Sequence, residues 1–412
     1  MKRKICILST SYPTGLESSN DFPPGKFVHD MAKNLILSGF EVHVITHHTL
    51  KTKSHEVLDG VHVHRFHYFF PFAESLTKGA GLPENIKKTK NKFLVPFYFI
   101  SLFIYSFIQI KKHKIDLINA HWVVPTGYIG LWLKKVTGKK LIVTMYGAEL
   151  FPILNGNMAF LKPYIKKVIN KADIVAGISE ATVETAFKLS NRKDIHIIPD
   201  GIDVEYYKLA NKNIEILNKY NCKNSDKVIF FTGRMVERKG HVFLIKAMKI
   251  IKDEIPNVKL ILGGKGPLFN ELVELRNSLG LEGQIIMPGF IEEFDLVPIL
   301  QSIDLFVLPS CIDSNGDTEG SATAAFEAMA CGKPALISKV GGNIGSIRDN
   351  EGGFYFEAGN ANDLAEKIIY ILTNEEIYKT NQQLSREFII SHYSWNKTID
   401  KYLHAIDGLT NN

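Results

Sequence analysis

Two glutamates and a helix start in the second half of the chain have the types and spacing to hold a phosphate-containing ligand. Glu319 and Glu327 are eight residues apart, which is a little over two helical turns. A helix that begins near Ser321 would direct its unpaired backbone N–H groups and the positive end of its dipole at a phosphate or diphosphate. The two carboxylates would then flank that ligand, one near its reactive end and one near ribose hydroxyls.

Arg234 and Lys239 lie in the run Gly233-Arg234-Met-Val-Glu-Arg-Lys239-Gly240, directly after an apolar stretch. An arginine fork and a lysine point charge together suit a diphosphate leaving group. The sequence has no Asp-x-Asp motif to hold a divalent metal beside it, so we expect neither a metal nor another cofactor. The glycines of Gly263-Gly264-Lys265-Gly266-Pro267 would let a flat base approach the backbone closely.

Short apolar runs rich in β-branched residues alternate with segments of helical period, which is typical of parallel strands joined by crossover helices. In the first half we expect strands at 5–8, 42–45, 117–119, 141–144, 174–176 and 195–198, and a helix from Phe27 to a stop at Gly39. In the second half we expect strands at 228–231, 259–262, 285–287 and 305–308, and helices at 241–252 and 268–279. The sequence predicts an α/β protein with two doubly wound halves.

A polar stretch from Asn211 to Lys227 separates the two halves. We place a first Rossmann-like domain at 1–203, a second at 204–390, and a C-terminal helix at 391–412 that packs back toward the first domain. Ligands of such sheets bind beyond the carboxyl ends of the strands. We therefore expect the domains to face each other across a cleft that contains the site.

Composition excludes several classes of protein. The 412 residues are 45% hydrophobic and 22% charged, which excludes a disordered or fibrous chain. The net charge of +6 suits anionic partners but does not indicate nucleic acid. Four distant cysteines, with no Cys-x-x-Cys pair, suggest neither a disulfide framework nor a zinc site and fit a reducing cytoplasm. The basic residues at the start of the chain are followed by only four apolar residues, at 5–8. This run is too short for a secretory signal, and we predict that it forms a strand.

The segment from Phe93 to Ile110 is 18 residues long, almost entirely apolar and flanked by lysines from Lys87 to Lys114. Its length and its direct continuation into a strand favour a buried helix packed on a sheet. The alternative is a helix that docks on an anionic membrane surface through the lysines.

Histidines are concentrated in the segment from His43 to His67. This segment contains seven of the fourteen histidines in the chain. Alternation in Val61-His-Val-His-Arg-Phe predicts that His62 and His64 line one polar face of a strand. We favour this interpretation over metal binding by His62, His64 and His67.

The order and spacing of these motifs resemble the family 4 glycosyltransferases, which are retaining enzymes of the GT-B fold. The second half carries Gly-Arg-x4-Lys-Gly at 233–240, Gly-Gly-x-Gly-Pro at 263–267, Glu-Gly-x6-Glu-Ala-Met-Ala-x-Gly-Lys-Pro at 319–334 and Gly341-Gly342. The first half carries Gly25-Lys-Phe-Val, Ala120-His-Trp, Thr144-x-Tyr-Gly-x-Glu, Ile178-Ser-Glu and Pro199-Asp-Gly-Ile-Asp. The resemblance covers nearly the whole chain and is strongest to enzymes that build surface polysaccharides and lipid-linked oligosaccharides.

The resemblance implies a role for each matching residue. Arg234 and Lys239 would hold the donor diphosphate, Glu327 would bind ribose and Glu319 would contact the transferred sugar. Further donor contacts are implied for Gly25, Gly264, Ile291 and the backbone of Ser321, Ala322 and Thr323, and an acceptor side for His121, Tyr146 and Glu149. Three positions depart from the usual family pattern: Tyr146 replaces a His, Asp200 replaces an Asn, and Gly345 stands where the family has an acid.

The implied reaction moves a sugar from a nucleoside-diphosphate donor to a glycan or lipid-linked acceptor, at the cytoplasmic face of a membrane. UDP is the expected carrier, with GDP left open. The acceptor hydroxyl would attack from the face of the leaving group and pass its proton to the departing phosphate oxygen, so that anomeric configuration is retained without a protein nucleophile. Fixed positive groups beside the phosphate would stabilise the transition state most.

Two other functions remain open from the sequence. A nucleotide-sugar 2-epimerase of the same fold would bind a UDP-sugar alone, and a non-catalytic scaffold would keep only the sugar-nucleotide site. The Glu-x7-Glu run with Arg234 and Lys239 disfavours the epimerase. A dehydrogenase is weaker still, because Ser9-Thr-Ser-Tyr-Pro stands where a dinucleotide site would have Gly-x-Gly-x-x-Gly.

Overall fold

The computed structural model describes residues 2–14, 25–49, 52–77, 82–86, 88–156 and 158–409. The chain forms two compact units. Unit 1 comprises Met1–Gly177, Val183–Ile198 and Ile399–Asn412, and unit 2 comprises Ile178–Thr182 and Pro199–Thr398. The main crossings between the units thus follow Ile198 and Thr398, whereas the predicted boundaries follow residues 203 and 390.

Unit 1 is built on a sheet that has eight strands in its described part, ordered β3-β4-β2-β1-β5-β6-β7-β8. Neighbouring strands are parallel except for the antiparallel pair β3 and β4. The strands are β1 (Lys4–Leu8), β2 (Glu41–His47), β3 (His55–Leu58), β4 (Val61–Phe66), β5 (Leu117–His121), β6 (Lys140–Met145), β7 (Ile174–Gly177) and β8 (His196–Ile197). The edge strand β3 was not predicted, because four residues of mixed polarity give little periodic signal.

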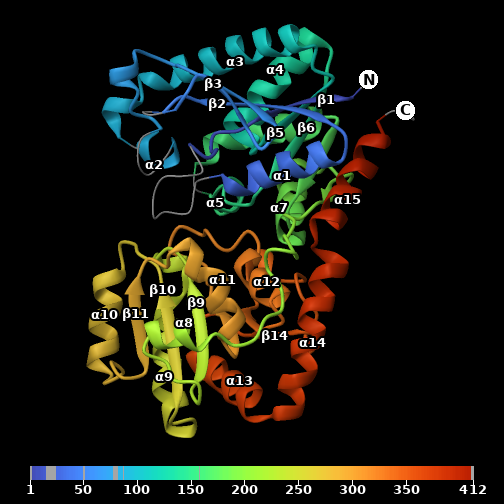
Figure 1. The fold of residues 1–412 in the computed structure, drawn as a ribbon. Coiled ribbons are helices and arrows are strands. Elements are labelled where there is room, and N and C mark those ends of the chain that lie inside the picture. The colour runs from blue at the N-terminus through green and yellow to red at the C-terminus, as the bar shows by residue number, and fades with distance from the viewer. Residues whose placement is uncertain are drawn as a thin grey trace. The chain divides into compact units, whose positions relative to one another are not determined.

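Helices cover both faces of the unit 1 sheet, so its central strands are buried on both sides (Figure 1). Contacts join α3 to α4 and to strands β2 and β4, and join α1 to the same two strands. The helices with residues in this unit are α1 (Lys26–Leu37), α2 (Leu82–Ile86), α3 (Leu94–His113), α4 (Tyr128–Thr137), α5 (Phe151–Leu154), α6 (Lys162–Lys171), most of α7 (Glu180–Ser190) and most of α15 (Trp395–Asp407).

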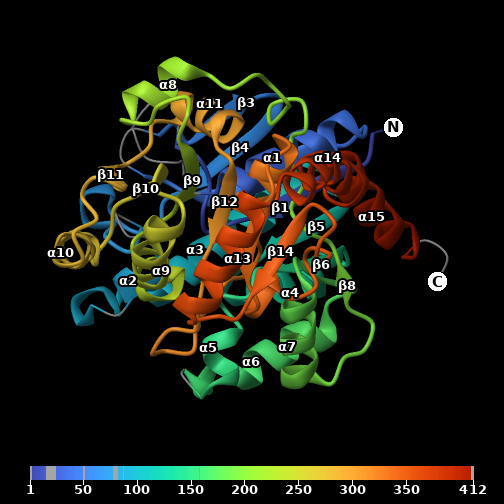
Figure 2. The same ribbon diagram turned by 90° about the horizontal axis from the view of Figure 1, so that it is seen from below.

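Unit 2 contains a sheet of parallel strands in the order β11-β10-β9-β12-β13-β14, with helices α9 and α13 on the near side in Figure 2. The strands are β9 (Lys227–Thr232), β10 (Val258–Gly263), β11 (Ile285–Gly289), β12 (Leu305–Leu308), β13 (Ala335–Ser338) and β14 (Gly353–Phe356). The helices are α8 (Ile214–Lys219), α9 (His241–Glu254), α10 (Phe269–Ser278), α11 (Glu293–Ser302), α12 (Thr323–Ala330), α13 (Ala361–Thr373) and α14 (Glu375–His392).

Each sheet has a switch point, which is the place where the order of its strands reverses direction. Counted along the chain, the unit 2 sheet reads third, second, first, fourth, fifth, sixth, so the order reverses between β9 and β12. In unit 1 the same reversal lies between β1 and β5. Loops that leave neighbouring strands at such a point diverge and leave space for a ligand. The predicted two doubly wound α/β halves are confirmed, and so is each predicted strand and helix, within a few residues.

Two local details sharpen the predictions. The helix expected near Ser321 begins at Thr323, because Ala322 still has non-helical backbone angles. His62 and His64 share one face of β4, as predicted, and α3 packs on β2 and β4, so that His64 is only 3% exposed. Alternation along a strand reveals which side chains share a face, but not what covers that face.

Candidate functional site

The switch point of unit 2 brings together the loops after β9 and β12. Lys239, at the end of a short 3₁₀ turn (Glu237–Lys239), places its Nζ 2.6 Å from Oε2 of Glu319. The hydroxyl of Ser310 donates to the same carboxylate oxygen at 2.9 Å, and Arg238 lies 3.7 Å from the other one. The structure therefore joins two predicted site residues, Lys239 and Glu319, into one charged group.

Burial makes the charges in this group interdependent. Burial of the Glu319 carboxyl would raise its pKa, but Lys239, Arg238 and the hydrogen bond from Ser310 together hold the pKa below its usual value. Glu319 is thus an anion at neutral pH although it is only 7% exposed. Its neighbour Asp317 has a raised pKa because burial outweighs the attraction of Arg238.

Glycines shape the loop that presents Glu319. The short turn Gly341–Asn343 after β13 packs under it, and the Gly342 N–H donates to the Glu319 carbonyl at 2.7 Å. A Cβ on Gly342 would overlap the Gly320 carbonyl and lie 3.0 Å from the Ser321 nitrogen. Gly342 is therefore required for the close approach of two backbones.

Arg234 and Gly264 lie in the loops after β9 and β10, which are hydrogen-bonded to each other. The Gly233 N–H donates to the Gly263 carbonyl at 3.2 Å, and Gly264 (φ +127°) donates to Gly289 at 2.6 Å. Ile291 is buried and packs against Gly263. The Arg234 side chain is exposed and has no hydrogen bond or ion pair with the residues that the structure describes. It is available to a ligand.

The start of α12 presents the predicted phosphate-binding backbone. Within the described part of the chain, no acceptor is recorded for the N–H groups of Ser321, Ala322 and Thr323. Four residues into the helix, Glu327 accepts a 3.0 Å hydrogen bond from the hydroxyl of Tyr207. Glu327 thus belongs to a different local group from Glu319.

Arg386 on α14 holds that second group in place. Its guanidinium donates to the carbonyls of Val204 at 3.0 Å, Tyr207 at 2.9 Å and Ala330 at 2.5 Å. It therefore ties the turn from Val204 to Tyr207 to the C-terminal end of α12. Neither Tyr207 nor Arg386 was predicted from the sequence, because no local spacing relates them to Glu327.

The three predicted acceptor-side residues meet at the switch point of unit 1. His121 ends β5, and its Nδ1 lies 2.6 Å from the hydroxyl oxygen of Tyr146. The Tyr146 N–H donates to Oε1 of Glu149 at 3.0 Å. Phe27 lies two residues after the predicted donor-contact Gly25, and its ring is tilted against that of Tyr146, with 4.8 Å between the ring centroids.

A chain of hydrogen bonds assigns the protons around His121. The Thr144 hydroxyl donates to the side-chain oxygen of Asn119 at 3.2 Å, so the Asn119 amide nitrogen donates to His121 Nε2 at 3.3 Å. Burial lowers the pKa of His121 to about 3, so the ring is neutral and carries its one proton on Nδ1. That proton is donated to the Tyr146 oxygen, which leaves the phenol proton of Tyr146 directed elsewhere.

Burial also sets the state of Glu149. It raises the pKa of this carboxyl to about 7, against weaker lowering by backbone N–H groups. The second oxygen, Oε2, is buried and has no hydrogen-bond partner among the described residues. Glu149 therefore titrates at a higher pH than an ordinary carboxyl, unlike Glu319.

Gly25 and Gly345 both have positive φ angles and leave no space for a side chain. Gly25 has φ +77°, and a Cβ there would lie 2.5 Å from the Ser11 carbonyl carbon, so only glycine allows this approach to the loop after β1. At Gly345 (φ +74°) a Cβ would lie 2.6 Å from Oε2 of Glu180. A carboxylate from Glu180 thus occupies the space beside the position where the family has an acid.

Sequence reasoning missed the residues that surround Glu319. Arg238 lies within the Gly233–Gly240 run but was assigned no role, and Ser310 was not singled out. A cation adjacent to Lys239 was the available signal for Arg238. The structure places Gly25, His121, Tyr146 and Glu149 in unit 1, and the other predicted site residues in unit 2.

Comparisons with known proteins agree with this organisation. A family model described as "Glycosyltransferase Family 4" matches residues 25–206, and one described as "Glycosyl transferases group 1" matches residues 212–388. One relative is the UDP-Gal:alpha-D-GlcNAc-diphosphoundecaprenol alpha-1,3-galactosyltransferase of Escherichia coli. It is 23% identical over 300 residues, which are 71% of this chain and 75% of the relative.

Solved structures extend the likeness to the fold. Sucrose-phosphate synthase from Thermosynechococcus elongatus matches with a TM-score of 0.79 at 19% identity, over 100% of both chains. HepE from Anabaena, solved in complex with UDP, matches with a TM-score of 0.73 at 19% identity, over 99% of this chain and 100% of that one. With two Rossmann-like units of GT-B type and both family models matched, the chain belongs to the family 4 glycosyltransferases.

Proposed function

We propose that this glycosyltransferase transfers a sugar from UDP to a glycan or lipid-linked acceptor of surface polysaccharide or glycoconjugate synthesis. Transfer would proceed with retention of configuration and without a metal. The observation that carries the proposal is the convergence of Lys239, Arg234 and the free N–H groups at the start of α12 on the switch point of unit 2.

The charges of the described residues favour a dianionic ligand at this point. Arg238 and Lys239 are each within 4 Å of a carboxylate, at Asp317 and Glu319, so these four groups balance. Arg234 adds a positive charge without a described partner, and the terminus of α12 adds a positive dipole end. The net local charge is positive, which suits the diphosphate of a nucleotide sugar.

The same groups account for transition-state stabilisation. As the bond between sugar and diphosphate breaks, negative charge grows on the leaving oxygen and the anomeric carbon becomes oxocarbenium-like. Lys239 keeps two N–H donors beyond the one given to Glu319, and with Arg234 it would neutralise that charge. The acceptor hydroxyl would attack on the same face and transfer its proton to the departing phosphate oxygen.

Glu319 has a positioning role in this scheme in addition to its predicted contact with the transferred sugar. Its Oε2 already accepts hydrogen bonds from Lys239 and Ser310, and its Oε1 lies 3.7 Å from Arg238. A carboxylate held in this way is a poor nucleophile, because attack would first break the ion pair. We assign Glu319 the task of fixing the Lys239 ammonium beside the diphosphate.

The identity of the base rests on the relatives. HepE was solved with UDP, and the Escherichia coli relative is named for UDP-Gal. The binding test is thermal denaturation of the pure protein with UDP, GDP, ADP or NAD. A ligand at 100 times its Kd stabilises by about 2.7 kcal/mol. We expect a rise with UDP that Arg234→Ala abolishes and that Arg348→Ala, a change at an exposed arginine on another loop, leaves intact.

Activity distinguishes this proposal from the other two functions. Incubation with a UDP-sugar and a lipid-linked acceptor should release UDP and form a product whose anomeric configuration, read by NMR, matches the donor, with the rate unchanged by a chelator. Formation of a 2-epimer from the UDP-sugar alone would show an epimerase instead. Binding of UDP without transfer or donor hydrolysis, across a panel of sugars and acceptors, would support the scaffold.

The acceptor side is proposed to work at an anionic membrane. Among the described residues α3 is the one helix long and apolar enough to span a bilayer by length and composition, and 33% of its apolar window is buried. Tyr98 and Leu102 pack inward, whereas Phe97, Ile100, Ile104 and Ile108 are 45–56% exposed. The expectation of a buried helix therefore holds for one face only, because the sheet covers just that face.

The lysines at both ends of α3 indicate that its exposed face binds an anionic lipid surface. Exposed lysines stand before the helix at 88, 90 and 92 and after it at 111, 112 and 114, while Lys87 lies outside the described residues. A row of apolar side chains between basic ends is typical of interfacial helices. Localisation at the cytoplasmic membrane face follows as part of the proposal.

Vesicle co-sedimentation tests this surface. We expect binding to vesicles with phosphatidylglycerol, weak binding to phosphatidylcholine alone, and loss of binding in Ile104→Glu/Ile108→Glu. Leu37→Glu is the matched control, because Leu37 is an exposed leucine on α1. Equal binding of the α3 double variant and the wild type would overturn the docking surface without affecting the donor-site proposal.

A further inference from the structure

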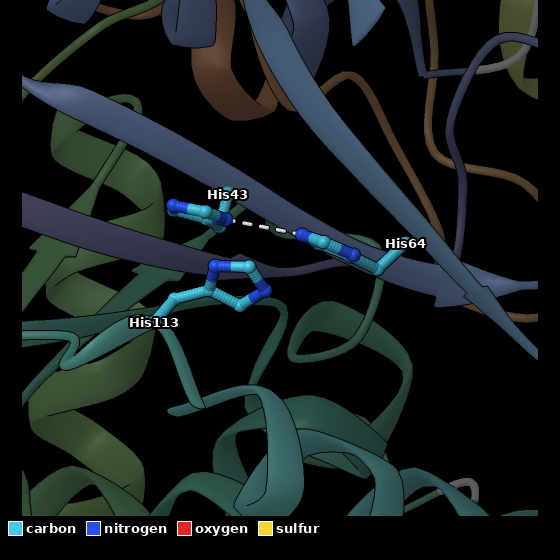
Figure 3. A group of neighbouring side chains, drawn as sticks. All are labelled: His43, His64 and His113. Atoms are coloured by element: carbon cyan, nitrogen blue, oxygen red, sulfur yellow. Dashed lines mark hydrogen bonds between the residues drawn. The ribbon is translucent and has the colours of Figure 1, made fainter. Parts of the chain in front are cut away.

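Five histidines gather on one face of the unit 1 sheet, outside the site described above. His43 lies on β2, His62 and His64 on β4, His55 on β3, and His113 is the last residue of α3. Successive imidazole rings lie 4.4–6.2 Å apart between centroids. Figure 3 shows His113 reaching from the end of its helix toward His43 and His64 on the two strands.

Three of these rings present nitrogen atoms to a common point. One ligand atom from each of His43, His64 and His113 lies within 4.8 Å of the other two. Nδ1 of His43 and Nε2 of His64 are 3.0 Å apart, while Nε2 of His113 is buried and has no hydrogen-bond partner among the described residues. A buried imidazole nitrogen without a partner is costly unless something else binds it.

An acidic residue orients the first of the three rings. Oε1 of Glu41 lies 3.0 Å from Nε2 of His43 and also accepts from Nζ of Lys4 at 2.7 Å. The Glu41 carboxylate accepts a hydrogen bond from Nε2 of His43, which leaves the Nδ1 lone pair of His43 facing His64. Histidines that bind metals are commonly oriented by such a carboxylate.

An unprotonated imidazole offers one nitrogen lone pair to a metal ion. His43 and His64 are only 2% and 3% exposed, whereas His113 is partly exposed and provides a path for an ion.

We propose that His43, His64 and His113 form a binding site for a divalent transition-metal ion of the zinc type. Three imidazole nitrogens are a donor set that suits Zn²⁺, at about 2.0–2.1 Å each, which places them about 3.3 Å apart in a tetrahedron. The His43–His64 separation of 3.0 Å is already near that value, and the ligand atom of His113 lies within 4.8 Å of both. Solvent supplies the fourth ligand on the open side beside His113.

The ion would join elements that are far apart in the sequence. It would fasten the C-terminal end of α3 to the adjacent strands β2 and β4. The site lies toward the amino end of β2, where His43 pairs with His62, whereas His121 ends β5 at the opposite edge. The metal is therefore structural, and it is separate from the sugar transfer, for which no metal is proposed.

A second group, His48, His67 and Glu74, also brings three ligand atoms within 4.8 Å of one another. Its atoms are already engaged. His48 Nε2 donates to the Thr52 carbonyl at 2.8 Å, and Glu74 accepts from the backbone N–H of Tyr68 at 2.7 Å. This group serves as the internal control for the proposed site.

The test is zinc titration of untagged protein that has first been stripped with a chelator. We expect one equivalent of Zn²⁺ to bind, a rise in Tm, and with Co²⁺ the visible absorption of a tetrahedral site. His113→Gln should lose at least tenfold in affinity, and Glu41→Gln about 10–100-fold. His67→Gln should bind as the wild type does.

Each alternative outcome overturns the site. Equal affinity of wild type and His113→Gln, or a loss confined to His67→Gln, would place the ion elsewhere. Failure of the stripped wild type to bind Zn²⁺ at all would also end the proposal. His64→Gln is the second ligand variant, and circular dichroism of each metal-free variant separates loss of a ligand from loss of the fold.

Discussion

Replacement of Lys239 by methionine tests how the donor-side charges are held. Methionine keeps the length and apolar stem of lysine but removes the ammonium that lies 2.6 Å from Glu319. The side chains of Lys239 and Glu319 are 18% and 9% exposed, so little water is present to replace the lost partner. Removing one member of a buried pair costs about 3–5 kcal/mol. Ser310 and Arg238 remain, and we therefore expect a loss of about 3 kcal/mol.

The double variant Lys239→Met/Glu319→Gln separates stability from function. With the buried anion removed as well, unfolding free energy should return to within about 1 kcal/mol of the wild type. Sugar transfer should stay abolished in both variants, because the diphosphate has lost the Lys239 ammonium. In a unit of this size, about 3 kcal/mol corresponds to a fall of roughly 6–12 °C in Tm, which calorimetry resolves.

The pH dependence of the single variant gives a second measure of the same effect. The pair holds the pKa of Glu319 below its usual value in the folded state. Its stabilisation is therefore present above the ordinary carboxyl pKa and is lost as pH falls through the folded-state pKa. The deficit of Lys239→Met should be full at pH 7 and should shrink toward zero in acid. A deficit under about 1 kcal/mol at pH 7, or a double variant less stable than the single one, would refute the reasoning.

Three further changes test other parts of the structure. Tyr207→Phe removes the 3.0 Å hydrogen bond to Glu327 and should raise the donor KM several-fold with about 1 kcal/mol lost in stability; an unchanged KM would separate Tyr207 from donor binding. Gly342→Ala should lower both Tm and activity, because its Cβ would overlap the Gly320 backbone, whereas Gly283→Ala, at a position with open space, should change neither. Burial raises the pKa of Glu149 from 4.5 to about 7, so the folded state holds a proton that the unfolded state releases and stability falls as pH rises through this range. Glu149→Gln should remove this fall in unfolding free energy, which amounts to up to about 3 kcal/mol. Identical pH profiles of Tm for the wild type and Glu149→Gln would contradict the raised pKa of Glu149.

Local periodicity was sufficient for the elements that position the site. The strand before Arg234 and the strand that begins at Leu305 were both predicted from the sequence. Each is a run of four or more apolar residues that a glycine or a proline follows, a pattern typical of a buried strand. Parallel pairing followed from the alternation of such strands with helices. The positions of Arg234, Lys239 and Glu319 at carboxyl ends of strands could therefore be predicted without coordinates.

The segment around α3 shows where periodicity stops being informative. Eighteen nearly continuous apolar residues fit a buried helix, a membrane span and an interfacial helix equally well by composition. The burial of Tyr98 and exposure of Ile104 depend on how much of the helix the sheet can cover, and a sheet packs on one side only. Sequence alone carries no measure of that coverage.

The amino-acid sequence by itself determined the two doubly wound halves and which residues stand at strand ends, since those properties depend on neighbours within a few positions. Only the tertiary structure decided the partners. Lys239 meets Glu319 across 80 residues, and His43 meets His64 and His113 from three separate elements. Such pairings depend on strand order and on which helix covers which face. They are set by the burial of the whole sheet, so no local spacing encodes them.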